Sequence, residues 1–278
     1  MPTPTIDLAV AAAPRGLTPR QRHAAGQFTQ YGLLVLIVAA VVFAVSRNPA
    51  YVAEQMFNLD TVAQMLPLMP LAFLNTLQYM LAGFAVGLTG GLVLALMKLY
   101  LVGPFRWLAT IYIEFFRGIP ALLVITTVGF VVPILLGHDL PSFTLKIALA
   151  LGAVSAAYVA ETLRAGIQAV PKGQIEASRS LGMSQAQALT TVIIPQGFRI
   201  VMPPLTNEVI ALTKDTSLVY MLGLLTQDME ITAVASNQLT SASGGLTPLF
   251  LGGLCYLIIT VPLGFVARHL EKKTKAQR

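Results

Sequence analysis

The sequence predicts an all-α membrane protein with about six transmembrane helices. Three observations lead to this prediction: the composition is apolar, long apolar runs recur along the chain, and basic residues gather in alternate loops. Of the 278 residues, 55% are hydrophobic and 11% are charged, and the mean hydropathy is +0.73. Soluble domains carry about 25% charged residues. The composition therefore excludes an ordinary water-soluble domain.

Two further classes are excluded by the same numbers. The sequence has a single cysteine, Cys255, so it cannot form a disulfide scaffold. The net charge of +6 would suit nucleic acid, but the basic residues flank apolar segments, as is usual in membrane proteins. We therefore expect membrane lipid and not nucleic acid around this chain.

Six apolar segments are long enough to cross a bilayer core of about 30 Å, which takes about 20 residues of helix. They are Phe28–Ser46, Ala72–Met97, Trp107–Leu136, Leu145–Val170, Phe198–Thr226 and Pro248–Ala267. The fifth has the weakest signal because charged residues interrupt it. The first has an alternative interpretation as a signal peptide cut after Ser46, but the stretch before it is long for such a leader. We expect a retained helix.

Lys and Arg in short loops set the orientation of membrane helices. Most of them fall in the N-terminal and C-terminal tails and in loops on the same side, so both termini are expected in the cytoplasm. The predicted order is a cytoplasmic tail (1–27), an extra first helix (28–46), an extracytoplasmic loop (47–71), a core of five helices (72–270) and a basic tail (271–278).

The cytoplasmic loop 171–198 has a design of its own. Gln174–Leu181 suits a short helix that ends at Gly182. Ser184 followed by Gln187 predicts a capping box at the start of a second helix, which Pro195 is expected to close. A plain amphipathic connector is the alternative. An elbow of two helices exceeds what joining neighbouring spans requires, which favours a surface that receives a soluble partner.

The loop resembles the EAA loop of ATP-binding-cassette (ABC) importers. The matching positions are Glu176, Ala177, Ser178, Gly182 and the run from Val192 to Pro195, with mild departures at Ser178, Val192 and Ile194. Residues 112–120, 157–166 and 205–218 are similar to segments of the branch that imports polar amino acids. The resemblance covers roughly Asn75 to Leu270.

The resemblance implies a type I importer permease in the inner membrane of a bacterium. It implies transport of a polar amino acid of the glutamate, glutamine, arginine or histidine class. The implied partners are an ATPase dimer, a second permease chain, identical or paralogous, and an extracytoplasmic binding protein. The binding protein is expected to contact the outer loops near Asn48–Leu71 and Gln227–Thr247. The residues expected to couple to the ATPase are Glu176, Ala177, Ser178, Gly182, Ser184 and Pro195.

This chain is not expected to be an enzyme or to bind a cofactor. It contains no phosphate-binding Gly-x-x-x-x-Gly-Lys-Ser/Thr loop, so ATP is expected to be used by a partner subunit. The three histidines are scattered and predict no metal site, and no catalytic constellation stands out. An ion-gradient-driven carrier and a membrane scaffold are the alternatives. The first would be expected to show internal repeats, and the second would not need charges inside the membrane.

Two pairs of charges lie toward the cytoplasmic ends of their spans. Glu114 with Arg117, and Glu161 with Arg164, are spaced to meet on one face of a helix. They predict structural ion pairs at the membrane edge. Gly118 and Pro120 are expected to break the helix just after Arg117, so part of an inner gate is the alternative for this segment.

The fifth span carries the main candidate for a substrate passage. Glu208 and Asp215 are seven residues apart and so share a helix face. A zwitterionic amino acid needs a cation and an anion, which Lys214 and these carboxylates can supply. The predicted passage consists of Asn207, Glu208, Thr213, Lys214 and Asp215, with a weaker signal at Asn75 and Thr76. Pairing between subunits and a gate are the alternatives.

Glycines recur every four residues on the second span, at Gly83, Gly87 and Gly91. Such a stripe predicts close helix packing, either within the chain or at a dimer contact.

Overall fold

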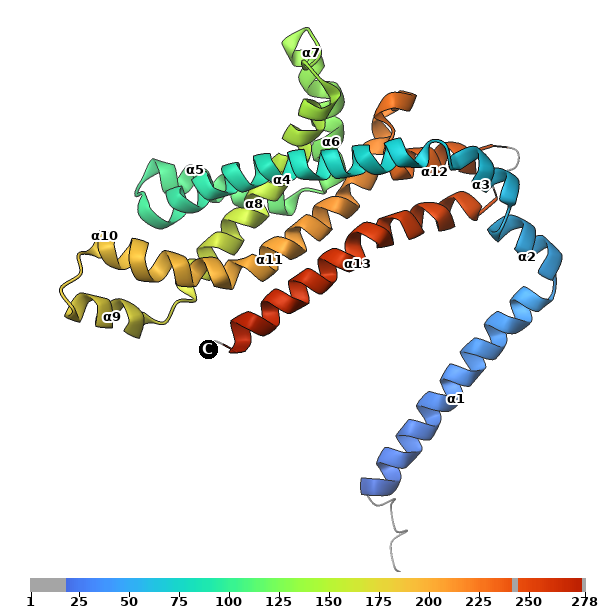
Figure 1. The fold of residues 1–278 in the computed structure, drawn as a ribbon, viewed down its shortest axis with the longest axis horizontal. Coiled ribbons are helices and arrows are strands. Elements are labelled where there is room, and N and C mark those ends of the chain that lie inside the picture. The colour runs from blue at the N-terminus through green and yellow to red at the C-terminus, as the bar shows by residue number, and fades with distance from the viewer. Residues whose placement is uncertain (1–18, 242–244, 277–278) are drawn as a thin grey trace, which may run out of the picture. The chain divides into compact units, whose positions relative to one another are not determined.

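The computed structural model describes residues 19–241 and 245–276, and all regular elements in these ranges are helices (Figure 1). The chain divides into two compact units, Met1–Glu54 and Gln55–Arg278. We describe each by itself.

The first unit contains α1 (Pro19–Ser46) and the start of α2 (Pro49–Met56). From Thr29 to Ser46, α1 is apolar enough to span a membrane, in agreement with the predicted extra helix. The predicted loop 47–71 is largely helical instead, because α2 and α3 (Leu59–Met65) occupy most of it. The Asn58 side chain caps α3 by accepting a hydrogen bond from the Thr61 amide.

The second unit is built on four long helices: α4 (Met69–Tyr100), α8 (Phe143–Gln168), α11 (Ile194–Asp215) and α13 (Thr247–Ala276) (Figure 1). Helix α8 is the most buried of these, with α4 and α11 packed against it and α13 packed against α11. Two short helices, α9 (Lys172–Ser180) and α10 (Gln185–Ala188), lie at the end of the bundle where α4 ends.

The predicted third span is not one straight helix. Helix α5 (Pro104–Gly118) ends before Pro120, and the chain continues through α6 (Ala121–Thr126), the π-helical η1 (Thr127–Val131) and α7 (Val132–Leu136). The two halves are bent by 106°. Ile119 is extended, the conformation favoured before proline, so the span over Trp107–Leu136 is broken at Gly118 and Pro120, as predicted.

The predicted fifth span also has different bounds. Helix α11 ends at Asp215 and gives way to the 3₁₀ helix η3 (Thr216–Leu222). A short turn, η4 (Thr226–Asp228), leads into α12 (Ile231–Leu239), a helix within what was predicted as an outer loop. The apolar content of residues 216–226 suggested a longer helix. Instead of extending α11, the residues of η3 pack against α4, α6 and α12.

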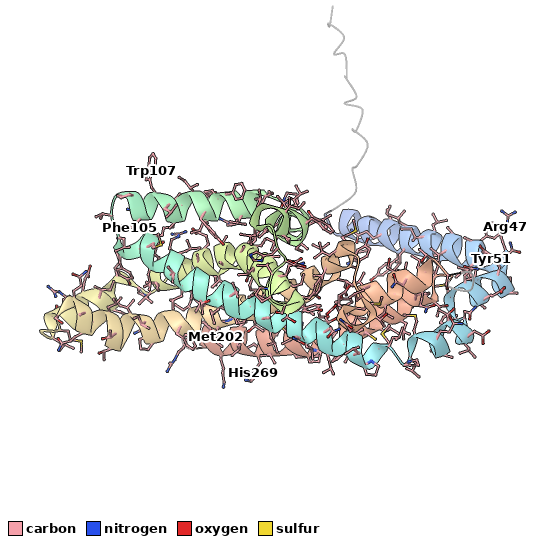
Figure 2. The ribbon with its side chains drawn as sticks, turned by 90° about the horizontal axis from the view of Figure 1, so that it is seen from above. Arg47, Tyr51, Phe105, Trp107, Met202 and His269 are labelled. Atoms are coloured by element: carbon pink, nitrogen blue, oxygen red, sulfur yellow. The ribbon has the colours of Figure 1, made fainter. Side chains whose placement is uncertain are left out.

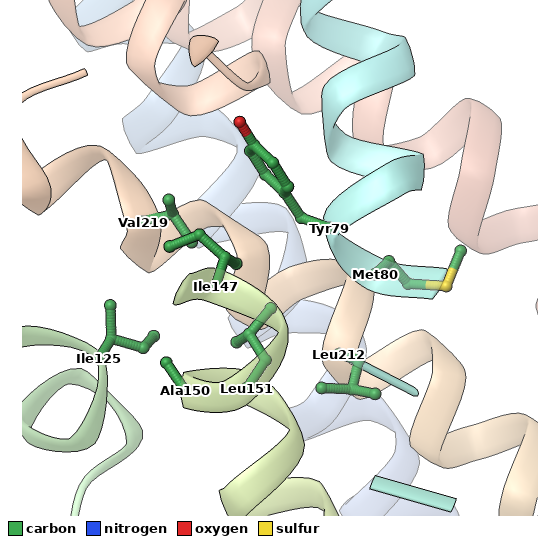
Figure 3. Close-up of a cluster of buried hydrophobic side chains, with 8 residues drawn as sticks. All are labelled: Tyr79, Met80, Ile125, Ile147, Ala150, Leu151, Leu212 and Val219. Atoms are coloured by element: carbon green, nitrogen blue, oxygen red, sulfur yellow. The ribbon is translucent and has the colours of Figure 1, made fainter. Parts of the chain in front are cut away.

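One apolar cluster joins α4, α6, α8, α11 and η3 (Figure 3). Ile147, Ala150 and Leu151 of α8 lie at its centre, between Tyr79 of α4 and Leu212 of α11. Met80, Ile125 and Val219 complete it from α4, α6 and η3. The cluster therefore fixes the C-terminal part of α11 against α8, which is where the predicted passage residues lie.

The glycine stripe of α4 packs on α8 within the same chain. A Cβ added to Gly87 would lie 2.6 Å from the Cβ and Oγ of Ser155, and one added to Gly91 would lie 2.6 Å from Val159. Neither distance leaves room for a methyl group. The stripe is thus an intramolecular contact, and the alternative of a dimer contact does not apply to this face.

Exposed apolar side chains cover the outer faces of α4, α5 and α13. Phe105 and Trp107, near the start of α5, point away from the rest of the chain (Figure 2). Within the described residues, four helices are long and apolar enough to cross a membrane, or five if the bent pair counts as one span. Helix α11, with its charged residues, is not among them. The fold class predicted from the sequence is confirmed as all-α and membrane-spanning.

Candidate transport path and coupling elbow

Helix α11 directs its two carboxylates to one side. Glu208 and Asp215 are half-buried, whereas Asn207 and Lys214 are exposed. Glu208 lies beside the hydroxyl of Ser155 on α8. That hydroxyl is buried and satisfies hydrogen-bond geometry with no atom of the described residues. The α8–α11 contact therefore holds polar groups with unused hydrogen-bonding capacity.

The Thr213 hydroxyl is not one of the polar groups with unused hydrogen-bonding capacity. Thr213 is fully buried, and its Oγ1 donates to the Val209 carbonyl one turn earlier at 2.8 Å. The five predicted residues therefore split into three groups: two half-buried carboxylates, two exposed polar side chains and one internal threonine.

Asn75 and Thr76 anchor the chain that precedes α12. The Asn75 amide donates to the carbonyls of Gln227 and Met229, each at 2.9 Å, and Thr76 Oγ1 accepts from the Ile231 amide at 3.3 Å. Both side chains are buried. These bonds fix the position of α12, so Asn75 and Thr76 have a structural role whether or not they also line the passage.

Glu230 is a buried carboxylate that the sequence reading missed. It caps α12 by accepting from the amides of Thr232 and Ala233 at 2.6 and 2.8 Å, and it accepts from the Tyr256 hydroxyl of α13 at 2.9 Å. The usual N-cap residues are Asn, Asp, Ser, Thr and Gly, so a Glu at this position gave no clear N-cap signal in the sequence. Assigning residues 227–247 to a loop also hid this residue.

One of the two predicted ion pairs is present. Arg164 binds the Glu161 carboxylate through Nη2 at 2.7 Å and Nε at 2.9 Å. Lys98 of α4 binds the other oxygen of Glu161 and thereby joins α4 to α8. The sequence analysis did not predict that Lys98, on the neighbouring helix, would bind Glu161.

The other predicted pair is absent from the described residues. No ion pair joins Glu114 to Arg117, and both side chains are exposed. Arg117 lies over the Tyr158 ring of α8 instead, 5.7 Å from its centroid. A cation–π contact with the neighbouring helix replaces the expected pair within α5.

A third ion pair lies in the turn before α8. Lys146 binds Asp139 at 2.7 Å. The hydrogen bond from Lys146, with a second from the Leu140 amide, holds the pKa of Asp139 below its usual value. This pair closes the α7–α8 turn and is remote from α11.

The loop 171–198 forms the predicted elbow. Helix α9 ends at Ser180, and Gly182 turns the chain with a φ of +81°. Ser184 and Gln187 form the predicted capping box, with hydrogen bonds of 3.2 and 2.8 Å. The sequence prediction of two helices joined at a glycine is confirmed.

Pro195 does not close the second helix, so that prediction was wrong. The chain passes from α10 through a π-helical turn, η2 (Leu189–Ile193), directly into α11, and Pro195 lies in the first turn of α11. The π-helical turn changes the backbone hydrogen-bonding pattern just before Pro195. Pro195 itself lies in the first turn of α11, where a residue without an amide hydrogen is tolerated.

The elbow presents a mixed surface to its surroundings. Glu176, Ala177 and Gly182 are exposed, whereas Ser178 and Ala188 are buried where α9 packs on the segment after it. The side chain of Leu181, at the tip, is 79% exposed. A single exposed apolar side chain is ordinary on a protein surface, so Leu181 by itself does not identify a docking surface.

Groups of three or more metal-binding side chains do not occur among the described residues. His23 has no described side chain, and His138 and His269 lie on separate elements.

The pattern of a family model matches residues 87–276, more than half of the chain. The model is that of the binding-protein-dependent transport system inner membrane component. The chain belongs to this family. Membership accounts for the order of spans from α4 to α13 and for the elbow between α8 and α11.

Several curated members of the family are similar in sequence. The arginine transport system permease protein ArtQ of Bacillus subtilis (strain 168) is 35% identical over 201 residues, which is 72% of this chain and 90% of ArtQ. The glutamate/aspartate import permease protein GltK of Escherichia coli O6:H1 is 30% identical over 224 residues, 78% of this chain and 98% of GltK.

Solved family structures share the fold. An amino acid ABC transporter crystallised with histidines superposes with a TM-score of 0.69 and 32% identity, covering 76% of this chain and 96% of that one. The inward-facing MetNI methionine ABC transporter gives a TM-score of 0.56 at 17% identity, a likeness of fold alone. The type I importer permease fold predicted from the sequence is confirmed.

Proposed function

We propose that this chain is the permease subunit of an ATP-driven importer for a polar amino acid of the glutamate, glutamine, arginine or histidine class. The family and the relatives named for arginine and glutamate/aspartate transport support this function. They give no support to the ion-gradient-driven alternative. The chain is a transport subunit in the bacterial inner membrane, with both termini in the cytoplasm, and ATP is hydrolysed in a separate subunit.

The observation that carries the site assignment is the α8–α11 contact. There, Glu208 lies beside a buried hydroxyl that has capacity for a further hydrogen bond. Asp215 lies about 10 Å further along the same side of the helix, given a rise of about 1.5 Å per residue. A substrate ammonium group pairs with these carboxylates in turn, while exposed Lys214 and Asn207 attract its carboxylate.

The elbow transmits the motion of the ATPase. An ATPase dimer docks on Glu176, Ala177 and the exposed Leu181, and Gly182 preserves the angle between the docked helix and α11. Because α10, η2 and α11 form one continuous path, movement of the elbow reaches Glu208 without crossing a loop. A second permease chain and an extracytoplasmic binding protein complete the importer.

Uptake by Glu208→Gln in liposomes containing the ATPase, with binding protein and radiolabelled amino acid supplied, tests the passage. We expect uptake to fall at least tenfold, since neutralising the carboxylate removes a charge-assisted bond worth about 1.5–3 kcal/mol. The matched control is Glu271→Gln, which removes an exposed carboxylate of α13 and should leave uptake unchanged. Full uptake with normal affinity by Glu208→Gln would remove Glu208 from the passage.

A further inference from the structure

Two adjoining cavities open beside the elbow, where α4, α8 and α11 meet it. Four residues line both of them: Leu99 and Tyr100 at the end of α4, Ile167 of α8 and Leu189 of η2. The cavities therefore form one groove with two ends of different chemistry.

The end between the long helices is apolar. It has a volume of about 200 Å³ and is lined along its length by side chains such as Leu92, Leu96, Leu163 and Val201. From Leu92 to Tyr100 it follows α4 for about 12 Å. That length is close to the thickness of one leaflet of a hydrocarbon core of about 30 Å. This end has the size and polarity of an acyl-chain site.

The end beside the elbow is basic. It has a volume of about 510 Å³, and Lys172 and Arg179 of α9 line it together with the amides of Gln168 and Gln185. Lys172 and Arg179 are seven residues apart and so lie on one face of α9. Neither forms an ion pair within the described part of the chain; Arg179 donates to the Met183 carbonyl at 3.3 Å and has other donors left.

One acidic side chain, Glu176, lies between these two cations in the sequence of α9, and it forms an ion pair with neither in the described residues. The described linings of both cavities contain no Asp or Glu. Glu161, on the adjoining helix α8, is already held by Lys98 and Arg164. The basic end therefore carries a net positive charge next to an apolar channel.

We propose that this groove binds an anionic phospholipid from the leaflet on the side of the elbow. One acyl chain lies along α4 and α8, and the phosphodiester lies between Lys172 and Arg179. Apolar length at one end and paired cations at the other match the two parts of such a lipid. The inference rests on the chain crossing a membrane and not on which solute it carries.

A bound anionic lipid would hold α9 to the ends of α4 and α8. Both cations project from the elbow helix, whereas the acyl-chain site belongs to the helices of the bundle. The lipid composition of the membrane would then influence how freely the elbow moves.

A tryptophan reporter tests the proposal in the full-length chain. The sequence has one tryptophan, Trp107. Trp107→Phe combined with Tyr100→Trp moves the indole to the wall shared by both cavities, at a side chain that is 47% exposed and so tolerates the larger ring. Nanodiscs of phosphatidylcholine would contain a minor fraction of brominated phosphatidylglycerol or of brominated phosphatidylcholine, whose bromines quench the indole.

We expect brominated phosphatidylglycerol to reach half-maximal quenching at roughly a thirtyfold lower fraction than brominated phosphatidylcholine, from about 1 kcal/mol for each of the two basic residues. Lys172→Gln with Arg179→Gln should abolish this preference. The matched control, Lys272→Gln with Lys273→Gln, removes two exposed charges of α13 and should retain it. Trp107 in the unmodified chain, 75% exposed on α5, should be quenched equally by both lipids.

Equal quenching of the Tyr100→Trp reporter by both lipids would overturn the proposal. So would a preference that survives the loss of Lys172 and Arg179. A reporter that neither lipid quenches would show that protein covers the groove. If quenching is lost only when the ATPase is added, the groove belongs to the ATPase contact.

Discussion

The α4–α8 pair and the α9–α10 elbow both depend on glycine, but for opposite reasons. At Gly87 the backbone of α4 is regular and there is no space, because Ser155 of α8 lies where a Cβ would be. At Gly182 nothing lies within 4 Å of an added Cβ, but the φ of +81° is one that other residues rarely adopt. The first glycine serves packing and the second serves backbone conformation.

This difference separates a fixed part of the molecule from a part suited to movement. The α4–α8 pair is packed along its whole length and is joined by Lys98 and Glu161 at its end. The elbow is mostly exposed, and few apolar contacts hold it. Elements with few buried contacts are those that move at low cost.

Substitution of Gly87 should produce the largest effect. Gly87→Val forces α4 away from α8, which costs about 3 kcal/mol or more. We expect little folded protein after detergent extraction, measured as the monodisperse fraction by size-exclusion chromatography. The double variant Gly87→Ala with Ser155→Gly should keep much more folded protein than Gly87→Val, because it removes the Ser155 atoms that the new Cβ would meet. No recovery would mean that the close approach is not the cause.

Substitution of Gly182 should leave the folded protein intact and change its coupling. A β-branched residue in the left-handed region costs at least about 1–2 kcal/mol, so Gly182→Val should alter the elbow angle without unpacking the bundle. We expect the yield of folded protein to be normal and the amount of solute imported per ATP hydrolysed to fall several-fold.

The matched control for that variant is Gly173→Ala. This glycine lies in the same elbow, with no positive φ and nothing within 4 Å of an added Cβ. Unchanged coupling in Gly182→Val, or an equal loss in Gly173→Ala, would contradict a specific role for the turn.

The Lys98–Glu161 bond should show the smallest effect. Lys98→Met removes one partner of a partly buried pair, but Arg164 still neutralises Glu161. We expect about 1 kcal/mol of destabilisation, seen as a small decrease in thermal midpoint in detergent, and Lys98→Arg should reverse most of it. A loss as large as that of Gly87→Val would show that charge, and not close packing, holds the pair.

Local signals along the chain were sufficient for much of the fold. Apolar length predicted α1, α4, α8 and α13, and the spacing of Gly182, Ser184 and Gln187 predicted the elbow with its capping box. They did not predict α12 or the continuation of η2 into α11. A short helix such as α12 is stabilised by its cap and by Tyr256 of a distant helix, and such partners are not visible in a local window.

The candidate passage shows the same limit. The spacing of Glu208 and Asp215 correctly placed them on one side of a helix. Which side faces α8, and that Ser155 lies opposite, depends on packing between segments more than 50 residues apart. The passage and coupling residues remain predictions that the transport experiments above test.

The sequence by itself determined that this protein is a helical membrane protein with a two-helix elbow, because hydropathy and turn chemistry act over a few residues. Its role as a permease was indicated by the resemblance of its motifs to a known family. Only the tertiary structure decided that the glycine stripe packs inside one chain, that Lys98 takes part in the Glu161 pair, and that Asn75 and Thr76 anchor α12. Those facts depend on which helix faces share a contact, and a helix presents several faces with similar apolar character. The choice among them is made by the fit of all helices together.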